Sequence, residues 1–280
     1  MAENKMIINS EYHGLENKYL ELKRIIWEMQ SAVIAFSGGV DSALVLKVAF
    51  DVLGSNAVAV TADSPSVPRR EIEIAQRTAK KIGVSHFLLK TDETKNPSYL
   101  KNPEDRCYFC KSELYNKIRE FAVKKEIRSM LNGTNFDDLD DYRPGLKAAE
   151  ECQIRAPLAE AKITKQEVRE LAKQIGLEIW DKPASPCLAS RVPYGNEITL
   201  KKLKMIEDAE NYLKDEFGVS ELRVRHFGNT ARIELRKEDF LVANDNIEKI
   251  RNGFENIGFN KVVLAEFKSG NLNKMLKILN

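Results

Sequence analysis

The residues best suited to chemistry stand in one short run, Ser37-Gly38-Gly39-Val40-Asp41-Ser42. An apolar stretch precedes this run and an amphipathic stretch follows it, so the order strand, loop, helix is predicted. Adjacent glycines let the backbone turn sharply and leave its N–H groups uncovered, while the serines add hydroxyl donors. A helix that begins here also favours an anion at its N-terminus. The run therefore predicts a loop that cradles phosphate groups.

The loop differs from the two commonest phosphate-binding motifs. It lacks the Gly-x-x-x-x-Gly-Lys-Ser/Thr spacing of the P-loop and the three glycines of the dinucleotide fingerprint. It resembles the pyrophosphate (PP) loop of the adenine nucleotide α-hydrolases, which split ATP into AMP and pyrophosphate. That resemblance implies that the loop amides bind pyrophosphate and that Asp41 helps to hold Mg²⁺. The alternative is a turn that serves packing alone; we favour the phosphate loop because the run follows a strand and opens a helix.

Cysteines form a second candidate site. Cys107 and Cys110 make a C-x-x-C pair just ahead of a predicted helix, and Cys187 lies far downstream in a proline-bounded loop. Three thiolates can bind a [4Fe–4S] cluster and leave one iron open for an extra sulfide. Cys152 has no cysteine or histidine near it in the sequence, so we interpret it as a small buried residue.

The C-x-x-C pair also permits other interpretations. It is typical of a redox pair, of half a zinc site, or of two inert core cysteines. A structural zinc site normally has four ligands, and His86 and His226 are poor candidates for the fourth. We favour the cluster.

Bulk properties limit the class of protein. The chain has 280 residues, enough for two domains, because single cores rarely grow much beyond ~250 residues. Its 44 basic residues nearly balance 42 acidic ones, so no global field selects nucleic acid. The sequence has neither an 18-residue apolar run nor a secretory leader at Met1, and we expect a cytoplasmic protein with reduced thiols.

Elements that position these residues alternate between strand and helix. Apolar runs predict strands at 32–36, 57–63, 86–89 and 129–135, and helical periodicity predicts helices at 11–30, 71–82 and 111–125. Thr164 and Glu167 form a capping box before another helix. This alternation predicts an α/β fold with a parallel sheet, whose strand ends form the ligand crevice.

Several candidate residues fall at that edge of the predicted sheet. Ser37, Asp63 and Gly133 each fall at the carboxyl end of a predicted strand, so we place the nucleotide there, with Ala35 and Ala62 beside it.

The chain changes character near Asn196. Beyond it we predict a helix at 200–217, strands at 221–226 and 231–235, a helix at 245–253 and a strand at 261–264. We therefore predict two domains. Residues 1–195 form a Rossmann-like PP-loop domain that carries the cysteine site, and residues 196–280 form a smaller α+β domain for substrate binding and oligomerisation.

Further motifs make the resemblance specific. They are Asp141-Tyr142-Arg143-Pro144-Gly145-Leu146-Lys147, Ser190-Arg191-Val192-Pro193-Tyr194-Gly195, Arg223-Val224-Arg225 and Ala231-Arg232-Ile233-Glu234-Leu235. With the loop, they make the chain resemble the LarE family of ATP-dependent sulfur insertases over nearly its whole length. That family adenylates a carboxylate of a pyridinium dicarboxylate mononucleotide and replaces oxygen with sulfur, a step of nickel-pincer nucleotide synthesis. Some members sacrifice a lone cysteine as sulfur donor, whereas Cys107, Cys110 and Cys187 together resemble the cluster-dependent branch.

The resemblance also implies a substrate site and an assembly. The implied substrate carries phosphate and carboxylates, which suit planar arginine forks, so Arg191, Arg223 and Arg225 are candidates, with Ser190 as a hydroxyl donor. Surface ion pairs with Glu221 and Glu234 are the alternative for Arg223 and Arg225. Asp141 and Arg143 either gate the site or cap the next helix. By resemblance Arg232, Glu234 and Lys268 lie near the same anion site, and the chain forms a homo-hexamer.

Other functions share parts of this pattern. A tRNA thiolase has the same loop and three cysteines but usually needs a basic face, which a net charge of +2 does not provide. An amidating ligase of the same loop class needs no cluster, and the glutamine-hydrolysing domain is not found in this sequence. A nucleotide sensor would not need the cysteines.

Overall fold

The computed structural model describes residues 2–140 and 144–267, with side chains from Gly14 to Leu139 and from Pro144 to Phe267. The chain divides into two compact units. The first comprises the chain up to Ser64 together with Arg69–Glu93 and Cys107–Ser185, and the second comprises Pro65–Pro68, Thr94–Arg106 and the chain from Pro186. This division falls at Pro186, before the boundary predicted near Asn196. No helix within the described residues is both long and apolar enough to cross a membrane.

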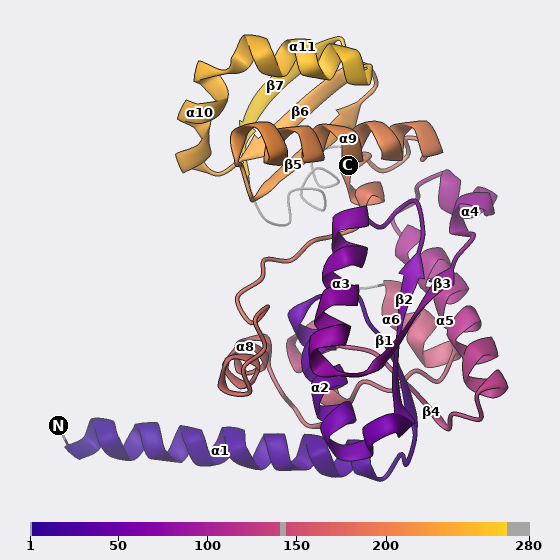
Figure 1. Cartoon of the computed structure of the whole chain (residues 1–280), viewed down its shortest axis with the longest axis vertical. Coiled ribbons are helices and arrows are strands. Elements are labelled where there is room, and N and C mark those ends of the chain that lie inside the picture. Colours follow the sequence, from indigo (N-terminus) through magenta and orange to yellow (C-terminus); the bar gives the residue numbers. More distant parts are fainter. Residues whose placement is uncertain (1, 141–143, 268–280) are drawn as a thin grey trace. The chain divides into compact units, whose positions relative to one another are not determined.

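The first unit contains a four-stranded parallel sheet in the order β3-β2-β1-β4 (Figure 1). Its strands are β1 (Ala32–Ala35), β2 (Ala57–Asp63), β3 (Ser85–Lys90) and β4 (Ser129–Leu131). The helices that accompany them are α1 (Ala2–Trp27), α2 (Val40–Leu53), α3 (Arg69–Ile82), α5 (Arg106–Lys124), α6 (Pro144–Glu151), α7 (Pro157–Glu160) and α8 (Lys165–Gln174). Short 3₁₀ turns are η1 (Gly54–Asn56), η2 (Glu93–Lys95) and η3 (Phe136–Asp140). The α/β fold predicted from the alternation of elements is confirmed.

Apolar layers cover both faces of this sheet. Ile34 joins a core with α1, α2, α3 and α8, whereas its neighbour Val33 joins a second core with α5 and α6. Successive strand residues point to opposite faces, so a strand covered on both sides is apolar throughout. Cys152 is 5% exposed in the second core, and the prediction that it is a buried small residue is confirmed.

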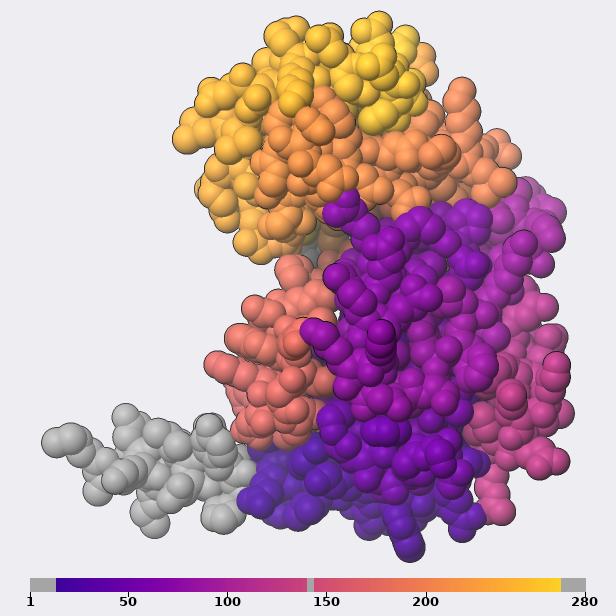
Figure 2. Space-filling model, viewed as in Figure 1, coloured from indigo at the N-terminus to yellow at the C-terminus, as the bar shows by residue number. Residues whose placement is uncertain are grey.

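The second unit has a three-stranded sheet in the order β5-β6-β7. β5 (Leu222–Phe227) pairs antiparallel with β6 (Thr230–Leu235), and β6 pairs parallel with β7 (Lys261–Glu266). The other elements are α4 (Pro97–Leu100), η4 (Leu188–Arg191), α9 (Leu200–Phe217), η5 (Lys237–Asp239), α10 (Phe240–Asp245) and α11 (Ile247–Ile257). Residues of α9, α11 and one sheet face form its core. The surface of these elements is coloured orange to yellow in Figure 2.

Local signals set several of these boundaries correctly. The capping box of Thr164 and Glu167 is present in both directions, and α9 has the predicted limits. β4 ends at Leu131, short of the predicted 135. α5 begins at Arg106, so Cys107 and Cys110 lie within the start of the helix and not ahead of it as predicted.

Candidate functional site

The loop after β1 is braced by its own serines. The hydroxyl oxygens of Ser37 and Ser42 lie 3.2 Å apart, and the Ser42 Oγ donates to the carbonyl of Gly39 at 3.1 Å. The backbone N–H of Ser37 reaches the Ser42 Oγ at 3.3 Å. These contacts hold the loop open at the start of α2, where the helix N-terminus favours an anion.

Two glycines let other segments approach this loop. Gly38 has a φ of +73°, and a Cβ there would lie 3.3 Å from the Glu71 carbonyl oxygen and from atoms of Ala75 in α3. A Cβ on Gly133 would lie 2.6 Å from the backbone nitrogen of Ser42. Only glycine permits both approaches, and the segment after β4 therefore lies directly against the first turn of α2.

The structure brings the other predicted nucleotide residues to the same sheet edge. Ala35 ends β1 opposite Val60 of β2, and Ala62 and Asp63 end β2 one strand away. Asp63 pairs with Arg69 at 2.5 Å. These positions form the ligand edge expected of a parallel sheet.

Asp41 lies in the first turn of α2 and has two polar partners. Its Oδ1 accepts a hydrogen bond from Asn135 Nδ2 at 3.1 Å, and its Oδ2 forms an ion pair with Lys165. The carboxylate is 21% exposed. Mg²⁺ is often bound through one carboxylate with phosphates and water completing its shell, and Asp41 fits that use.

A second lysine reaches the loop from the other side. Lys182 Nζ donates to the Gly38 carbonyl at 2.8 Å and pairs with Glu71 Oε2 at 2.5 Å. Lys165 and Lys182 therefore bring cationic charge to the loop from segments distant in the sequence. Sequence reasoning missed both. Lys165 did carry one signal, because a cation in the first turn of a helix opposes the helix dipole.

The three predicted cysteine ligands belong to different units. Cys107 and Cys110 lie one helical turn apart at the start of α5 in the first unit, where Cys107 is exposed and Cys110 is half-buried. Cys187 directly precedes η4 in the second unit and is half-buried. The i, i+3 spacing suits two ligands of one centre, and a helix N-terminus favours thiolates. Among residues 2–140 and 144–267, no group of three or more His, Cys, Asp or Glu side chains could hold a metal ion.

Arg225 and Arg191 are buried and paired with carboxylates. Arg225 lies 2.9 Å from Glu234, which is fully buried, and its Nη1 donates to the Ser190 carbonyl at 2.8 Å. Arg191 pairs with Glu210 of α9 at 2.9 Å. Arg191 Nη1 also donates to the Cys187 carbonyl at 3.1 Å and to the Ser190 Oγ at 3.0 Å. The predicted role of Arg191 as a substrate fork thus competes with a structural role at the Cys187 loop.

Positive charge exceeds negative charge on this sheet face. Burial, followed by the nearby charges of Arg191 and Arg225, lowers the pKa of Arg223 to about 10. Arg232 Nε is buried without a hydrogen-bond partner and lies 4.0 Å from Glu234 Oε1. Four arginines therefore share the carboxylates of Glu210 and Glu234, which suits the face to an anion. We call this set the arginine face.

Of the alternative ion pairs with Glu221 and Glu234, the one between Arg225 and Glu234 forms, but in the interior and not at the surface. Glu221 pairs with Arg236, and Glu234 pairs with Arg225 in the interior. Lys268 and the Asp141-Tyr142-Arg143 part of the predicted motif lie outside the described residues.

Comparison with known proteins decides the family. A family model for the queuosine biosynthesis protein QueC matches residues 31–103, which contain the loop. The chain is 37% identical to the pyridinium-3,5-bisthiocarboxylic acid mononucleotide synthase of Lactiplantibacillus plantarum, over 94% of this chain and 96% of that protein. The chain belongs to the family of this synthase. This is the LarE family that the motifs resemble.

Other relatives extend the comparison. An uncharacterized protein of Synechocystis is 48% identical over 94% of this chain and 99% of its own length. The NH(3)-dependent NAD(+) synthetase of Aeropyrum pernix is 28% identical over 65% of this chain and 68% of its own length. This LarE-family chain is an ATP-dependent enzyme of the PP-loop class, as its sequence predicts.

Proposed function

We propose that this LarE-family chain adenylates a carboxylate of pyridinium-3,5-dicarboxylate mononucleotide and exchanges oxygen for sulfur to give a thiocarboxylate. The observation that carries this proposal is the full-length similarity to the named synthase. The loop at Ser37 and the arginine face supply the two anion sites that the reaction needs.

Adenylation makes a reluctant carboxylate reactive. Its oxygen attacks the α-phosphorus of ATP, pyrophosphate leaves, and the resulting acyl adenylate carries AMP as a good leaving group. The loop amides stabilise the departing pyrophosphate, and Lys165 and Lys182 offset its charge. Asp41 is the residue that would hold Mg²⁺, which neutralises further negative charge when bound.

The arginine face suits the phosphate and carboxylates of the substrate. Arg223 has a half-buried cation whose charge an anion would stabilise, and Arg232 has an unused buried donor. Arg225 and Glu234 hold the neighbouring donors in place, and Ser190 lies beside them. We assign substrate binding, and with it assembly into a homo-oligomer, to residues 196–280.

For the sulfur source we propose that Cys107, Cys110 and Cys187 together hold a [4Fe–4S] cluster. When bound by three thiolates, such a cluster offers an open iron that can carry a replaceable sulfide. The sulfur forms a bond to the activated carbonyl carbon as AMP leaves with the original oxygen. The C-x-x-C pair supports this source over sacrifice of a lone cysteine, since sacrifice has no use for the pair.

Anaerobic purification with iron and sulfide analysis tests the sulfur source. We expect near four irons per chain, lost together with sulfur transfer when Cys107, Cys110 or Cys187 is replaced by Ala. Cys152→Ala is the matched control and leaves both intact, because Cys152 is buried in the core between α5 and α6. An iron-free chain that still transfers sulfur supports the sacrificial mechanism, and stoichiometric zinc contradicts the cluster.

A further inference from the structure

The second unit holds the Cys187 loop at both ends, through Ser66, which Tyr99 contacts, at the first end and through Asn102 directly at the other. At the first end, the backbone N–H of Leu188 donates to the Ser66 carbonyl at 2.8 Å, and the Ser66 Oγ lies 2.7 Å from the Tyr99 hydroxyl. At the other end, Asn102 Nδ2 lies 3.2 Å from the carbonyl oxygen of Val192 and 2.7 Å from that of Pro193. We call residues 97–106 the clamp segment.

Asn102 has an unusual backbone conformation, and its hydrogen bonds to the loop compensate for it. Its φ is +54°, a left-handed conformation that few residues besides glycine and asparagine adopt, and its side chain is fully buried. Besides the contacts to Val192 and Pro193, its Nδ2 reaches the Asn196 carbonyl at 3.1 Å, and its own carbonyl accepts from Gly195 N–H at 3.0 Å. These contacts supply hydrogen-bond donors to three carbonyls of the loop and tie residues 192–196 to Asn102.

Arg106 completes the contact from the end of the clamp segment. It is 3% exposed, and no ion pair to it is found among the described residues. Its Nη1 donates to Asn102 Oδ1 at 2.9 Å, and its guanidinium lies 4.5 Å from the ring centroid of Tyr194. Arg106 is also the first residue of α5, so the residue that follows it in the chain is Cys107.

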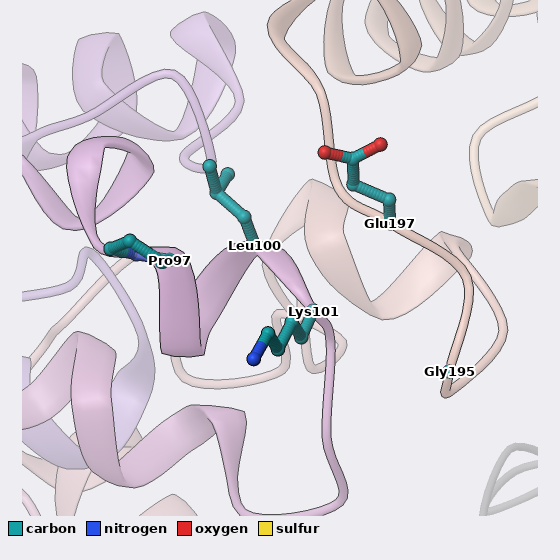
Figure 3. Close-up of a pocket in the computed structure, with 5 residues that line it drawn as sticks. All are labelled: Pro97, Leu100, Lys101, Gly195 and Glu197. Atoms are coloured by element: carbon teal, nitrogen blue, oxygen red, sulfur yellow. The ribbon is translucent and has the colours of Figure 1, made fainter.

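The outer side of this contact is visible as a hollow of about 380 Å³. Figure 3 shows Pro97, Leu100 and Lys101 of the clamp segment on one side of it and Gly195 and Glu197 of the loop on the other. The Ile198 N–H donates to the Leu100 carbonyl at 2.8 Å. The two stretches of chain therefore run together over several residues.

We propose that the clamp segment fixes the conformation in which the Cys187 thiol is presented, and that Asn102 and Arg106 are its positioning residues. The inference deepens the proposed function, on which it rests where it concerns sulfur transfer. Neither residue is required to touch substrate. Their effect passes through the loop that Asn102 holds at residues 192–196 and that Tyr99 and Ser66 hold at Leu188.

The test is Asn102→Gly, which keeps the left-handed backbone and removes the side-chain contacts. It is placed in a chain whose other cysteines are replaced by Ala, and the rate of Cys187 alkylation by iodoacetamide is followed by mass spectrometry. We expect alkylation to become about tenfold faster, since hydrogen bonds that close the loop are lost. In the chain with all cysteines present, sulfur transfer should fall by about the same factor while ATP affinity stays within twofold.

Glu126→Gly is the matched control, because Glu126 has a φ of +55° and an exposed side chain. It should leave both rates unchanged. Arg106→Lys keeps the charge but loses the fork and the stacking on Tyr194, so it gives a second variant with a smaller change in the same direction.

Each outcome decides the proposal. If the rate of Cys187 alkylation changes by less than twofold in both variants, the clamp is overturned. If alkylation is faster but the rate of sulfur transfer is unimpaired, the positioning role is overturned. Loss of ATP binding in Asn102→Gly would show a general loss of folding; a similar loss in Arg106→Lys overturns the proposal. If the unaltered chain transfers no sulfur, the proposed function has failed, and alkylation alone then decides whether the clamp exists.

Discussion

The loop after β1 and the arginine face are both suited to anions, yet they are built in opposite ways. The loop uses backbone N–H groups, glycines and serines whose hydroxyls bond within six consecutive residues. The arginine face uses two buried arginines, Arg191 and Arg225, paired with carboxylates of α9 and β6, and two half-buried arginines of β5 and β6, Arg223 and Arg232. A site made of backbone is encoded locally, whereas a site made of buried charge depends on partners distant in the chain.

The largest expected effect is the loss of unfolding free energy when Arg225 of the arginine face is replaced. Arg225→Met leaves Glu234 buried without its ion-pair partner at 2.9 Å, and breaking a buried pair costs about 3–5 kcal/mol. Urea unfolding of the second unit measures this loss. Arg236→Met breaks the more exposed pair with Glu221 and should cost at most about 1 kcal/mol. Equal effects of the two changes would contradict the account of a buried charged site.

In the loop after β1, we expect ATP binding to be weakened by steric crowding and not by the loss of a charge. Gly133→Ala places a Cβ 2.6 Å from the Ser42 nitrogen, and such overpacking costs about 1–3 kcal/mol. ATP affinity, measured by equilibrium dialysis, should fall at least tenfold because the first turn of α2 must shift. Gly14→Ala is the control, since a Cβ on this exposed helical glycine meets no atom within 4 Å. Unimpaired ATP binding in Gly133→Ala would remove the proposed site from this loop.

Arg223 sharpens the comparison because burial and like charges outweigh the favourable effect of Glu234 and Glu210 on its cation. Burial and the nearby Arg191 and Arg225 lower its pKa to about 10. Above about pH 10 the folded chain therefore binds fewer protons than the unfolded chain, and the contribution of Arg223 to stability rises with pH. At pH 7 the cation is a cost that a bound anion offsets.

Arg223→Gln should consequently leave the free energy of unfolding unchanged or raise it slightly. The parent chain should gain thermal stability when a phosphate monoester is added, and the variant should gain much less. Differential scanning fluorimetry with and without the ester measures both. An equal gain in parent and variant would show that the ester binds elsewhere.

The smallest expected effect concerns His226 in the core of the second unit. Burial, with a minor contribution from Lys202, lowers the pKa of this histidine, so the folded state disfavours its protonated form. The unfolded chain then binds the extra proton, and stability is lost as the pH falls below the ordinary histidine pKa of about 6.5. His226→Phe preserves the aromatic contact with Phe259. In this variant the urea-unfolding midpoint should change less between pH 7 and pH 5 than in the parent chain. A pH dependence that persists unchanged would assign it to other groups.

The contrast between the two sites also explains what the sequence predicts. Ser37, Gly38 and Ser42 indicate the loop because their contacts lie within one turn of chain, and Thr164 with Glu167 indicates a helix start for the same reason. The substrate implied by the resemblance, together with the chemistry of arginine, predicted Arg191, Arg223 and Arg225 as anion ligands. Residue type could not indicate that Arg191 is engaged by Glu210, because that pair joins η4 to α9.

Lysines at the loop show the same limit. Lys165 and Lys182 contact Asp41 and Gly38 across more than a hundred residues of sequence, and no local periodicity encodes such a contact. Asn102 was likewise missed, since its left-handed backbone and its contacts with residues 192–196 are visible only in the folded chain.

The most direct test of the account is the stoichiometry of one reaction. The anaerobic chain is supplied with ATP, sulfide and pyridinium-3,5-dicarboxylate mononucleotide, and AMP, pyrophosphate and thiocarboxylate are counted against chain concentration. The account predicts one AMP and one pyrophosphate for each thiocarboxylate formed, over many turnovers per chain. Thiocarboxylate formed without cleavage of ATP would contradict activation by adenylation, and a yield that stops at one sulfur per chain would contradict the replaceable sulfur source.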